Sequence, residues 1–397
     1  MSIIRYNTVG DKMKIVGLIV EYNPLHYGHL YHIKETKKTL QPDVLIAVMS
    51  GNFVQRGEIA IADKFTRTKM ALHAGVDLVV ELPTIYTLQS ADIFAKASVS
   101  ILHHLGVTDI CFGSEDGDIQ ALESVASTLD SSVYHEKLKE HLSHGDSFPT
   151  SSHKAMQEVH QNDGYDLPNN ILGIQYVRAA KELNTKIKLH TIKRIASGYY
   201  DDILDDTHIQ SASAIRSLLH EKKDIEQFVP DYVFSLLRES GTVNYEEFFP
   251  YIKYKLLSST PDELHAIYGM DEGIEHRLIE LIGEASDYDD FIKKVITRRY
   301  TNARLNRLMM HVLLGTKKQH LNTRDIPYIR ILGMNQIGQG YLSKIKHDIH
   351  TTLITNIKKD HSDLLEIDLR ASKIMNMLSD KDIFKEEFSP PIILHID

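Results

Sequence analysis

The sequence has little cysteine and no long apolar run, and both absences narrow what the protein can be. Cys111 is the only cysteine among 397 residues, which excludes an intramolecular disulfide and a Cys-rich zinc site. No apolar stretch reaches the roughly 18 to 20 residues that a membrane span needs. The first twelve residues lack the apolar core of a secretory signal. We therefore expect a cytoplasmic protein, with residues 1–12 as an N-terminal extension.

Motifs of several large enzyme classes are missing as well. Neither the GxxxxGK[ST] pattern of P-loop ATPases nor the HExxH pattern of zinc proteases occurs. Gly338-Gln339-Gly340 lies among predicted helices, which makes it a weak candidate for a dinucleotide site. His103 and His104 end a predicted helix and are interpreted as surface or packing residues. The chain is therefore not a P-loop ATPase, and its histidines show no metal-binding spacing.

Length and composition set the broad class. With 397 residues the chain is too long for one typical core, so two domains, or three, are expected. An apolar fraction of 42% and a charged fraction of 25% are those of an ordinary globular protein. The net charge of −9 argues against indiscriminate binding to nucleic acid.

Positive charge is nevertheless concentrated in one stretch, called the basic segment below. Between Lys293 and Arg330, ten lysines or arginines stand against one acidic residue, Asp325. Such a segment on an acidic protein can steer a polyanion to one face. The alternative is a solvated helix face rich in arginine. The residues expected to contact the polyanion are Arg298, Arg299, Arg304 and Arg307.

Apolar runs and helical periodicity alternate over the first half of the chain. Predicted strands cover 14–22, 43–51, 77–83, 108–114 and 186–194. Predicted helices cover 28–40, 63–74, 90–105, 118–130 and 170–183. Apolar strands separated by helices predict right-handed βαβ units and a parallel sheet with helices on both faces. The fold class is therefore α/β, and ligands should bind beyond the carboxyl ends of the strands.

The second half has a different pattern. A polar loop is expected over 196–210, and nearly everything after it has helical periodicity, including 288–299 and 301–314. We predict a first domain over residues 13–210 and an all-helical domain over 211–380, which contains the basic segment. The remaining residues, 381–397, should form an extended or frayed tail.

The most informative segment is His26-Tyr27-Gly28-His29. It lies between the first predicted strand and the first predicted helix, so the backbone N–H groups of residues 28–31 should form an anion-binding helix N-terminus. Gly28 should let a ligand approach the backbone, and His26 and His29 should donate hydrogen bonds to phosphate. With 22 histidines in the chain, such a pair can arise by chance. Its position between strand and helix favours a nucleoside triphosphate site.

Polar turns follow the other predicted strands at the same edge of the sheet. Residues 50–52 follow the second strand, residues 113–115 the fourth, and Arg194 the fifth. Because the carboxyl ends of parallel strands lie at one edge, these turns should converge on the His26–His29 turn. Arg194 would then neutralise phosphate charge.

Two groups of charged residues near this edge have two interpretations each. Lys64 and Arg67 either serve the triphosphate or lie on a surface helix. Glu115, Asp116 and Asp118 either hold a metal or cap the following helix and complement its dipole, and capping is favoured.

Longer stretches around these turns resemble a known family. In order, they are VGLIVEYNPLHYGHLYH (16–32), MSGNFVQRGEIAIADKFTR (49–67), DLVVELP (77–83), FGSE (112–115), PNNILGIQY (168–176) and IKR (192–194). With the basic segment, they resemble the tRNA(Met) cytidine acetate ligase family of HxGH nucleotidyltransferases, over essentially the whole chain from Met13. Members of that family more often carry Phe and Asn where this chain has Leu25 and Tyr27. Both histidines and the glycine of the motif are present.

The resemblance implies a fold and a two-step reaction. A Rossmann-like nucleotidyltransferase domain that binds ATP would be followed by a helical domain that binds tRNA. Acetate would attack the α-phosphate of ATP and release pyrophosphate, and the acetyl group would pass to N4 of the wobble cytidine of elongator tRNA(Met). ATP would bring Mg²⁺ with it, although the sequence shows no carboxylate pair that would fix the metal.

The resemblance also assigns site residues. His26 and His29 would be catalytic, and Arg56 would contact acetate or tRNA. The stretch Ser211–Arg216 would bind phosphate at another helix start, unless Ser211 is a plain N-cap. The residues expected around ATP are Ile19, Val20, Glu21, Tyr22, Asn23, Pro24, Leu25, His26, Tyr27, Gly28, His29, Leu30, Tyr31, His32, Gly113, Asn170, Arg194 and Ile195.

Two other functions stay open at this point. One is a small-molecule adenylyltransferase, although such chains are usually short and lack a long helical region with a basic face. The other is a non-catalytic RNA-binding protein that uses ATP as a structural or regulatory ligand.

Overall fold

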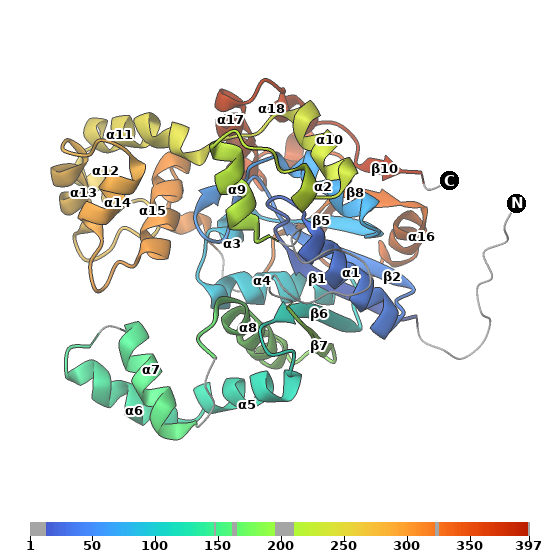
Figure 1. Cartoon of the computed structure of the whole chain (residues 1–397), viewed down its shortest axis with the longest axis horizontal. Coiled ribbons are helices and arrows are strands. Elements are labelled where there is room, and N and C mark those ends of the chain that lie inside the picture. The colour runs from blue at the N-terminus through green and yellow to red at the C-terminus, as the bar shows by residue number, and fades with distance from the viewer. Residues whose placement is uncertain (1–12, 147, 161–164, 195–209, 322–324, 396–397) are drawn as a thin grey trace, which may run out of the picture.

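A mixed, mostly parallel sheet of eight strands runs through the centre of the molecule (Figure 1). The computed structural model describes residues 13–146, 148–160, 165–194, 210–321 and 325–395. The strands are β1 (Ile15–Val20), β2 (Val44–Ser50), β5 (Leu78–Leu82), β6 (Asp109–Ser114), β7 (Lys188–Lys193), β8 (Tyr328–Asn335), β9 (Thr352–Ile354) and β10 (Ile392–Leu394). Their order is β10-β8-β5-β2-β1-β6-β7, with β9 paired to β8. β1 lies between β2 and β6 and is parallel to both, so the turns after these three strands lie next to one another at one edge of the sheet.

The strand side chains alternate between two hydrophobic clusters, one on each face of the sheet. In β2, Leu45 and Ala47 belong to one cluster, and Val44 and Ile46 belong to the other. Helices α1 (Tyr27–Leu40) and α2 (Lys64–His73) contribute to the first cluster, and α4 (Ala91–His104), α8 (Pro168–Glu182) and α16 (Gln336–Ile345) to the second. Every residue of β2 is buried, as expected for a parallel strand covered on both faces.

The first half of the chain follows the predicted order of elements. β1, β2, β5, β6 and β7 occur where the apolar runs are, and α1, α2, α4, α5 (Ile119–Leu129) and α8 where the helical periodicity is. β1 pairs in parallel with β2 and β6, and β6 pairs in parallel with β7. The predicted α/β class with a mostly parallel sheet is confirmed.

Two groups of helices extend beyond the sheet. α6 (Ser132–Ser143) and α7 (Phe148–Val159) form a helical hairpin at the bottom of Figure 1. The helical region at the top and left of Figure 1 contains α9 (Ala212–His220), α10 (Asp231–Ser240), α11 (Phe249–Ser258), α12 (Pro261–His265), α13 (Ile274–Ile282), α14 (Tyr288–Val295) and α15 (Asn302–Leu314). Its buried side chains share one hydrophobic cluster with the α1–α2 face of the sheet, so the core is continuous between the two.

Short elements connect these parts. A two-stranded hairpin is formed by β3 (Phe53–Val54) and β4 (Glu58–Ile59), and α3 (Thr84–Thr87) follows β5. The 3-10 helices are η1 (Glu226–Phe228), η2 (Tyr245–Phe248), η3 (Lys318–His320), η4 (Lys359–His361) and η5 (Asn376–Leu378).

The prediction that residues 211–380 are all helical is wrong. All eight residues of β8 are buried, and the strand lies beside β5 and antiparallel to it. β9 pairs with the first residues of β8. An apolar run that is covered on both faces has no alternation, so periodicity cannot distinguish it from a buried piece of helix. The sheet therefore takes strands from both sides of residue 210.

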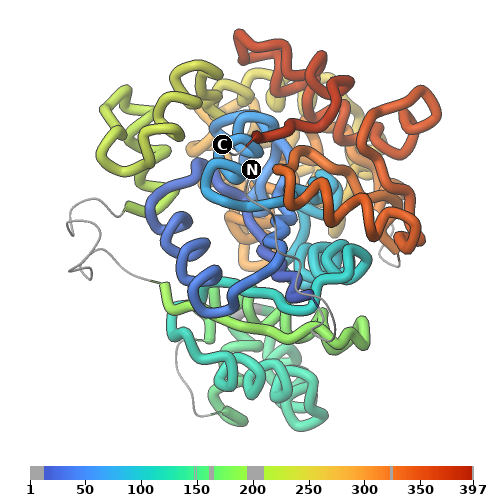
Figure 2. The backbone as a smooth tube through the Cα atoms, turned by 90° about the vertical axis from the view of Figure 1, so that its right-hand side faces the viewer, coloured from blue at the N-terminus to red at the C-terminus, as the bar shows by residue number. Residues whose placement is uncertain are grey.

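The prediction of an extended or frayed tail over 381–397 is also wrong for much of its described length. α17 (Glu366–Met375) is followed by α18 (Ile383–Glu386), and β10 pairs in parallel with β8. The side chain of Glu387 is fully buried. Figure 2 shows these last segments, in red, against the blue segments of the N-terminal half. The end of the described chain is part of the core.

Some expectations fall outside the described residues. These are the N-terminal extension over residues 1–12 and the loop over 196–210, apart from residue 210 itself. The division into domains at residue 210 stays a prediction. None of the helices within the described ranges is long and apolar enough to cross a membrane.

Candidate active site

The chain turns sharply between β1 and α1, at the carboxyl edge of the sheet. Tyr22 has a left-handed backbone with a φ of 49°, and the Asn23–Pro24 peptide bond is cis. His26 is extended, with a φ of −138° and a ψ of 174°, and it is the N-cap of α1. Its Nδ1 accepts a hydrogen bond from the backbone N–H of Gly28 at 3.0 Å. The predicted helix start after the first strand is confirmed.

Gly28 is required by the imidazole of His26. A Cβ atom at residue 28 would lie 2.9 Å from Cε1 and 3.1 Å from Nδ1 of that ring. Any larger residue would push the ring out of its capping position. The structure therefore shows a role for this glycine that the sequence did not suggest, which is to make room for the first histidine of the motif.

The first N–H groups of α1 already have partners. The N–H of Gly28 is bound by His26 Nδ1, and the N–H groups of His29 and Leu30 donate to the carbonyl of His26 at 2.9 and 3.0 Å. The prediction that the N–H groups of residues 28–31 bind an anion requires them to be unpaired, and for residues 28–30 they are not. Because Nδ1 of His26 is an acceptor, the proton of its neutral ring lies on Nε2. At the start of α1, the group that can donate a hydrogen bond to a ligand is therefore Nε2–H of His26, and not the backbone N–H groups of residues 28–30.

The rings of the two histidines of the motif are in close, tilted contact, and both are neutral. The ring centroids of His26 and His29 are 3.9 Å apart, with 33° between the planes. Burial, and then the charge of Arg194, lower the pKa of His26 to about 3. Burial, His26 and Arg194 hold the pKa of His29 well below its usual value. At pH 7 each side chain is thus a neutral imidazole that can donate one hydrogen bond.

Several buried polar atoms around this turn have no hydrogen-bond partner. They are Oη of Tyr22, Nδ2 of Asn23, Nδ1 of His29, Nε2 of His32 and Oγ of Ser50. Buried polar groups are nearly always hydrogen-bonded, so a cluster of unsatisfied ones calls for an explanation. A polar ligand at the carboxyl ends of β1 and β2 would supply the partners, and these residue types therefore fit ATP.

Arg194 brings positive charge to the same turn. It follows β7, and its backbone N–H donates to the carbonyl of Ser114 at 2.8 Å. Its charge contributes to the lowered pKa values of His26 and His29. Burial and Arg194 also lower the pKa of His32 to about 4. The guanidinium therefore lies near all three rings, as the convergence of polar turns predicts.

Two further predicted residues shape the surroundings of Arg194. A Cβ atom at Gly113 would lie 3.2 Å from Cγ of Arg194, so the glycine lets this side chain pass closely. The side chain of Asn170, at the start of α8, accepts from the backbone N–H of Glu115 at 3.0 Å, and the backbone N–H of Asn170 donates to Glu115 Oε2 at 2.8 Å. Ile195 lies outside the described residues.

The remaining residues predicted to surround ATP lie along the turn. Those that are partly exposed are Ile19, Val20, Glu21, Tyr27, Leu30 and Tyr31. Those that are buried within the turn are Tyr22, Asn23, Pro24 and Leu25. The carboxylate of Glu21 accepts from the N–H of Gln55 at 2.7 Å, and burial raises its pKa. The exposed members can present side chains to a ligand, whereas the buried members shape the turn.

The acidic residues after β6 cap two helices. Asp118 accepts from the N–H groups of Gln120 and Ala121 at the start of α5. Glu115 instead accepts from the N–H groups of Asn169 and Asn170 at the start of α8. The prediction that these residues cap the following helix is therefore confirmed for Asp118, whereas Glu115 caps α8 instead. In the part of the chain that the structure describes, no group of three or more His, Cys, Asp or Glu residues is placed to hold a metal ion.

Lys64 and Arg67 are inside the protein. Lys64 makes ion pairs with Glu81 at 2.6 Å and with Glu387 at 2.9 Å. Arg67 is fully buried, and its hydrogen bonds go to backbone carbonyls. The interpretation of these two residues as a surface helix face is wrong.

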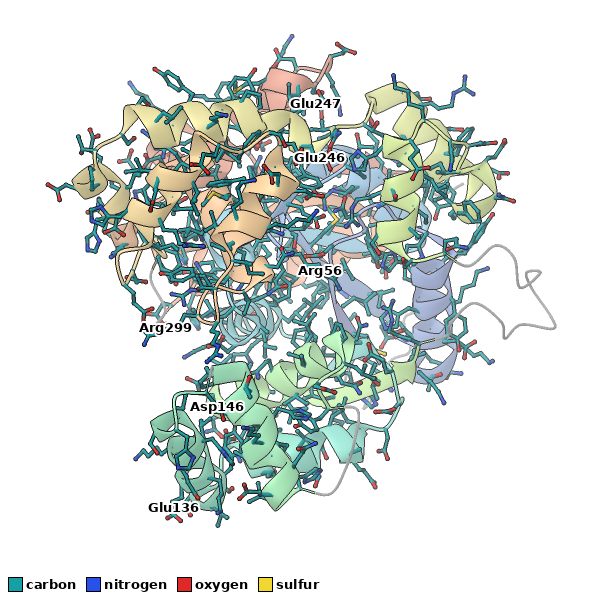
Figure 3. All side chains as sticks on the ribbon, turned by 60° about the vertical axis from the view of Figure 1, so that its left-hand side comes forward. Arg56, Glu136, Asp146, Glu246, Glu247 and Arg299 are labelled. Carbon is teal, nitrogen blue, oxygen red and sulfur yellow. The ribbon has the colours of Figure 1, made fainter. Side chains whose placement is uncertain are left out.

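The basic segment starts in the last turn of α14, with Lys293 and Lys294, and then passes through a loop into α15. Arg298 and Arg299 are exposed between α14 and α15, so the prediction of one helix over 288–299 is wrong beyond residue 295. Figure 3 shows Arg299 at the edge of the helical region. The guanidinium of Arg304 lies 3.9 Å from the centre of the Tyr300 ring, and Arg307 is partly buried. Arg298 and Arg299 are therefore the most accessible of the four predicted arginines.

The β3–β4 hairpin lies between the nucleotide site and the basic segment. Arg56 is exposed at its turn and is labelled near the centre of Figure 3. Gly57, with a φ of 84°, packs so closely on the backbone of Arg307 that no Cβ atom would fit. Burial and the charge of Arg56 lower the pKa of Arg194. Arg56 is thus close to both candidate surfaces.

Arg216, the last residue of the Ser211–Arg216 stretch, has a role at the turn that the sequence did not reveal. Ser211 caps α9, accepting from the N–H of Ala214 at 3.2 Å, so the N-cap interpretation of that stretch is confirmed. Arg216, on the same helix, donates to the carbonyl of Asn23 at 3.0 Å and pairs with Glu58 at 2.9 Å. No local pattern could identify it, because both partners are distant in sequence. Phosphate binding by this stretch stays a prediction.

The chain is similar to known proteins over most of its length. Residues 13–388 match the model of the HIGH Nucleotidyl Transferase family. The chain is 41% identical over 379 residues to the tRNA(Met) cytidine acetate ligase of Halalkalibacterium halodurans, covering 91% of each protein. It is 41% identical over 383 residues to that of Bacillus subtilis, covering 92% of each. The crystal structure of Thermotoga maritima TmcAL bound with alpha-thio ATP superposes with a TM-score of 0.88 at 32% identity, covering 97% of this chain and 100% of that one.

Proposed function

The chain belongs to the tRNA(Met) cytidine acetate ligase family, and we propose that it performs the reaction of that name. In this reaction ATP activates acetate, and the acetyl group is transferred to N4 of the wobble cytidine of elongator tRNA(Met). The observation that carries the proposal is the start of α1. There, two closely packed neutral histidines and Arg194 lie at a turn that contains several unsatisfied buried polar atoms.

The first step is an attack on phosphorus. A carboxylate oxygen of acetate bonds to the α-phosphorus of ATP, the bond to the bridging oxygen of the β-phosphate breaks, and pyrophosphate leaves. Negative charge builds on the phosphoryl oxygens as this happens, so fixed donors at those oxygens lower the barrier. We assign these donors to Nε2–H of His26 and to the imidazole of His29. The cap from Gly28 holds His26 in the tautomer that can donate.

Arg194 and magnesium would balance the charge of the triphosphate. Arg194 lies close enough to the motif to lower the pKa values of both its histidines. Mg²⁺ keeps several waters and is commonly held by substrate phosphates and few protein carboxylates. Since the described residues contain no cluster of three potential ligands, we propose that the metal enters as part of the MgATP substrate.

The second step transfers the acetyl group to the base. The exocyclic N4 of cytidine attacks the carbonyl carbon of acetyl-adenylate, the bond to the phosphate oxygen breaks, and AMP leaves while N4 releases a proton. A wobble base lies in an unpaired loop, so bringing it to the adenylate requires no opening of a duplex. The product is N4-acetylcytidine.

The basic segment is proposed to hold the anticodon stem. Arg298 and Arg299 are exposed, and arginines of this kind bind RNA phosphates through charge and hydrogen bonds. Arg56 lies between this segment and Arg194, which suits it to the phosphates or the acetate near the reacting base. As a tRNA-modifying enzyme, the protein would act in the cytoplasm.

A reconstituted reaction tests the proposal. Purified protein is incubated with MgATP, acetate and unmodified elongator tRNA(Met), and we expect release of pyrophosphate and N4-acetylcytidine in the nucleoside mass spectrum. A transcript with uridine at the wobble position has no N4 amine and serves as the control, which should stay unacetylated. The proposal fails if the natural transcript yields neither pyrophosphate nor acetylated cytidine.

A further inference from the structure

Arg67 is one of the largest side chains in the protein that is completely buried. It lies in the first turns of α2, beneath the turn that leads to the histidine motif. Its Nε donates to the carbonyl of Ala62 at 2.9 Å. One Nη donates to the carbonyls of Glu21 at 2.6 Å and Ser50 at 3.1 Å, and the other donates to the carbonyl of Gly51. A single guanidinium therefore binds the chain just beyond β1 and at the end of β2.

Both of the segments that Arg67 holds border the candidate active site. The carbonyl of Glu21 immediately precedes Tyr22, whose left-handed backbone is sparsely populated for a residue other than glycine. Arg216 binds the carbonyl of Asn23 on the other side of the same residue. Two arginines thus bracket the turn that sets the direction of the chain toward the histidines.

The surroundings of Arg67 provide carbonyls and no hydrogen-bonded carboxylate. Three carboxylates are near enough to favour its charge, and each has other partners. Asp63 caps α2 and pairs with Lys381, Glu21 accepts from Gln55, and Glu81 pairs with Lys64. A buried charge is costly unless its donors are satisfied. Here backbone carbonyls accept from the donors of Arg67, and three of these four carbonyls belong to the two active-site segments.

Only an arginine can make this arrangement. The guanidinium has five N–H donors in a fixed plane, whereas a lysine has three donors on one nitrogen atom. Four of the five donors are taken by carbonyls on three separate stretches of chain. Lysine would keep the positive charge and lose the simultaneous contact with the ends of β1 and β2.

We propose that Arg67 is a positioning residue for acetate activation, which fixes the turn after β1 relative to the turn after β2 and contacts neither ATP nor acetate. This inference rests on the proposed function, because it concerns the geometry of that reaction. Fixed geometry matters most in the transition state, where a displacement of about 1 Å can lower the rate by about 10². Loss of Arg67 should therefore lower kcat more than it raises KM.

The test compares Arg67→Lys with a matched control in the first half-reaction, the acetate-dependent exchange of labelled pyrophosphate into ATP. The control is Arg277→Lys, because Arg277 also binds backbone carbonyls, those of Lys294 and Val295, but in the helical region. We expect kcat of Arg67→Lys to fall by about 10², with KM for ATP changed less than about threefold. Arg277→Lys should retain the wild-type exchange rate.

Other outcomes separate the possibilities. Wild-type exchange in Arg67→Lys overturns the inference, and so does a rise in KM for ATP as large as the fall in kcat, because that result indicates a phosphate ligand. If the wild-type protein itself shows no exchange, the proposed function fails rather than the positioning role.

If Arg67→Lys does not fold, a second measurement on the wild-type protein tests the same inference. Guanidinium ¹⁵N–¹H resonances of Arg67 in the wild-type protein should exchange slowly with water and should not shift when MgATP is added. Fast exchange, or a large shift on adding MgATP, overturns the inference.

Discussion

The histidine turn and the basic segment are both suited to binding anions, but their side chains differ in charge, packing and exposure. At the start of α1 the donors are neutral, closely packed rings, and His26 is fixed by its bond to Gly28. In the basic segment the donors are charged, and Arg298 and Arg299 are exposed. Fixed donors suit a transition state, where geometry decides the rate, whereas mobile charges suit the capture of a large polyanion.

The difference also separates what each region contributes to stability. The exposed pair of Arg299 with Glu272, at 3.3 Å, is of the kind that contributes between nothing and about 1 kcal/mol. The histidine turn, by contrast, contains buried polar atoms without partners and a left-handed residue, which are costs that the surrounding core must offset. Substitutions in the two regions should therefore affect different measurements.

The largest expected effect is on chemistry at the histidine turn. His29→Ala should lower the rate of acetate-dependent pyrophosphate exchange by about 10² to 10³, because it removes one fixed donor. Affinity for tRNA should change less than about twofold, since the basic segment is intact. His103→Ala is the control, as His103 is exposed at the end of α4. If exchange in His29→Ala equals that of the wild type, the turn is a binding site without a catalytic role.

A smaller effect is expected in the basic segment. Neutralising Arg298 and Arg299 to Gln should weaken tRNA binding on the order of 50-fold near 0.1 M salt, since each lost phosphate contact lowers the slope of log affinity against log salt by roughly 0.7 to 0.9. Pyrophosphate exchange without tRNA should stay at the wild-type rate.

The control for this charge change is a pair of exposed lysines on the far helix. Lys344→Gln with Lys346→Gln removes the same charge from α16. Equal losses of affinity in the two double variants would show that net charge, and not the basic segment, attracts tRNA.

The contrast between the regions also explains which parts could be predicted from the sequence. Five strands and five helices of the first half follow a pattern in which apolar runs alternate with helical periodicity, whereas β3, β4, α3, α6 and α7 were not predicted. The position of the histidine motif follows from that pattern. The motif comes directly after a strand, and the carboxyl ends of parallel strands all lie at the same edge of the sheet. The exposure of Arg298 and Arg299 could also be predicted, because arginine side chains mostly lie at the protein surface.

What could not be predicted depends on contacts between distant parts of the chain. β8 is buried on both faces and so lacks the alternation that identifies a strand. Lys64 and Glu387 are of residue types that normally lie at the surface, and both are buried because each takes part in ion pairs across the core, with one another and with Glu81 or Arg330. The role of Gly28 likewise depends on where the ring of His26 lies, which no spacing reveals.

The smallest effect tests whether buried neutral histidines destabilise the fold in acid. Burial is the main cause that lowers the pKa of His26 to about 3, and of His32 and His311 to about 4, from an ordinary value of 6.5. The unfolded chain therefore takes up protons below pH 6.5 that the folded chain does not, so stability present above pH 6.5 is lost as the pH falls toward 4. Each such histidine lowers the free energy of unfolding by about 1.4 kcal/mol for each pH unit in that window, which is a change of about tenfold in the ratio of folded to unfolded protein.

His311→Gln isolates one of these groups far from the histidine turn. The ring lies in the helical region, with Nε2 bonded to the carbonyl of Leu88 at 2.9 Å, and the amide of glutamine can replace that donor without titrating. Urea unfolding at pH 7, 6 and 5 should show a pH dependence weaker than that of the wild type by about one histidine, with pyrophosphate exchange unchanged. An unaltered slope would mean that His311 has the same pKa in the folded protein as in the unfolded chain.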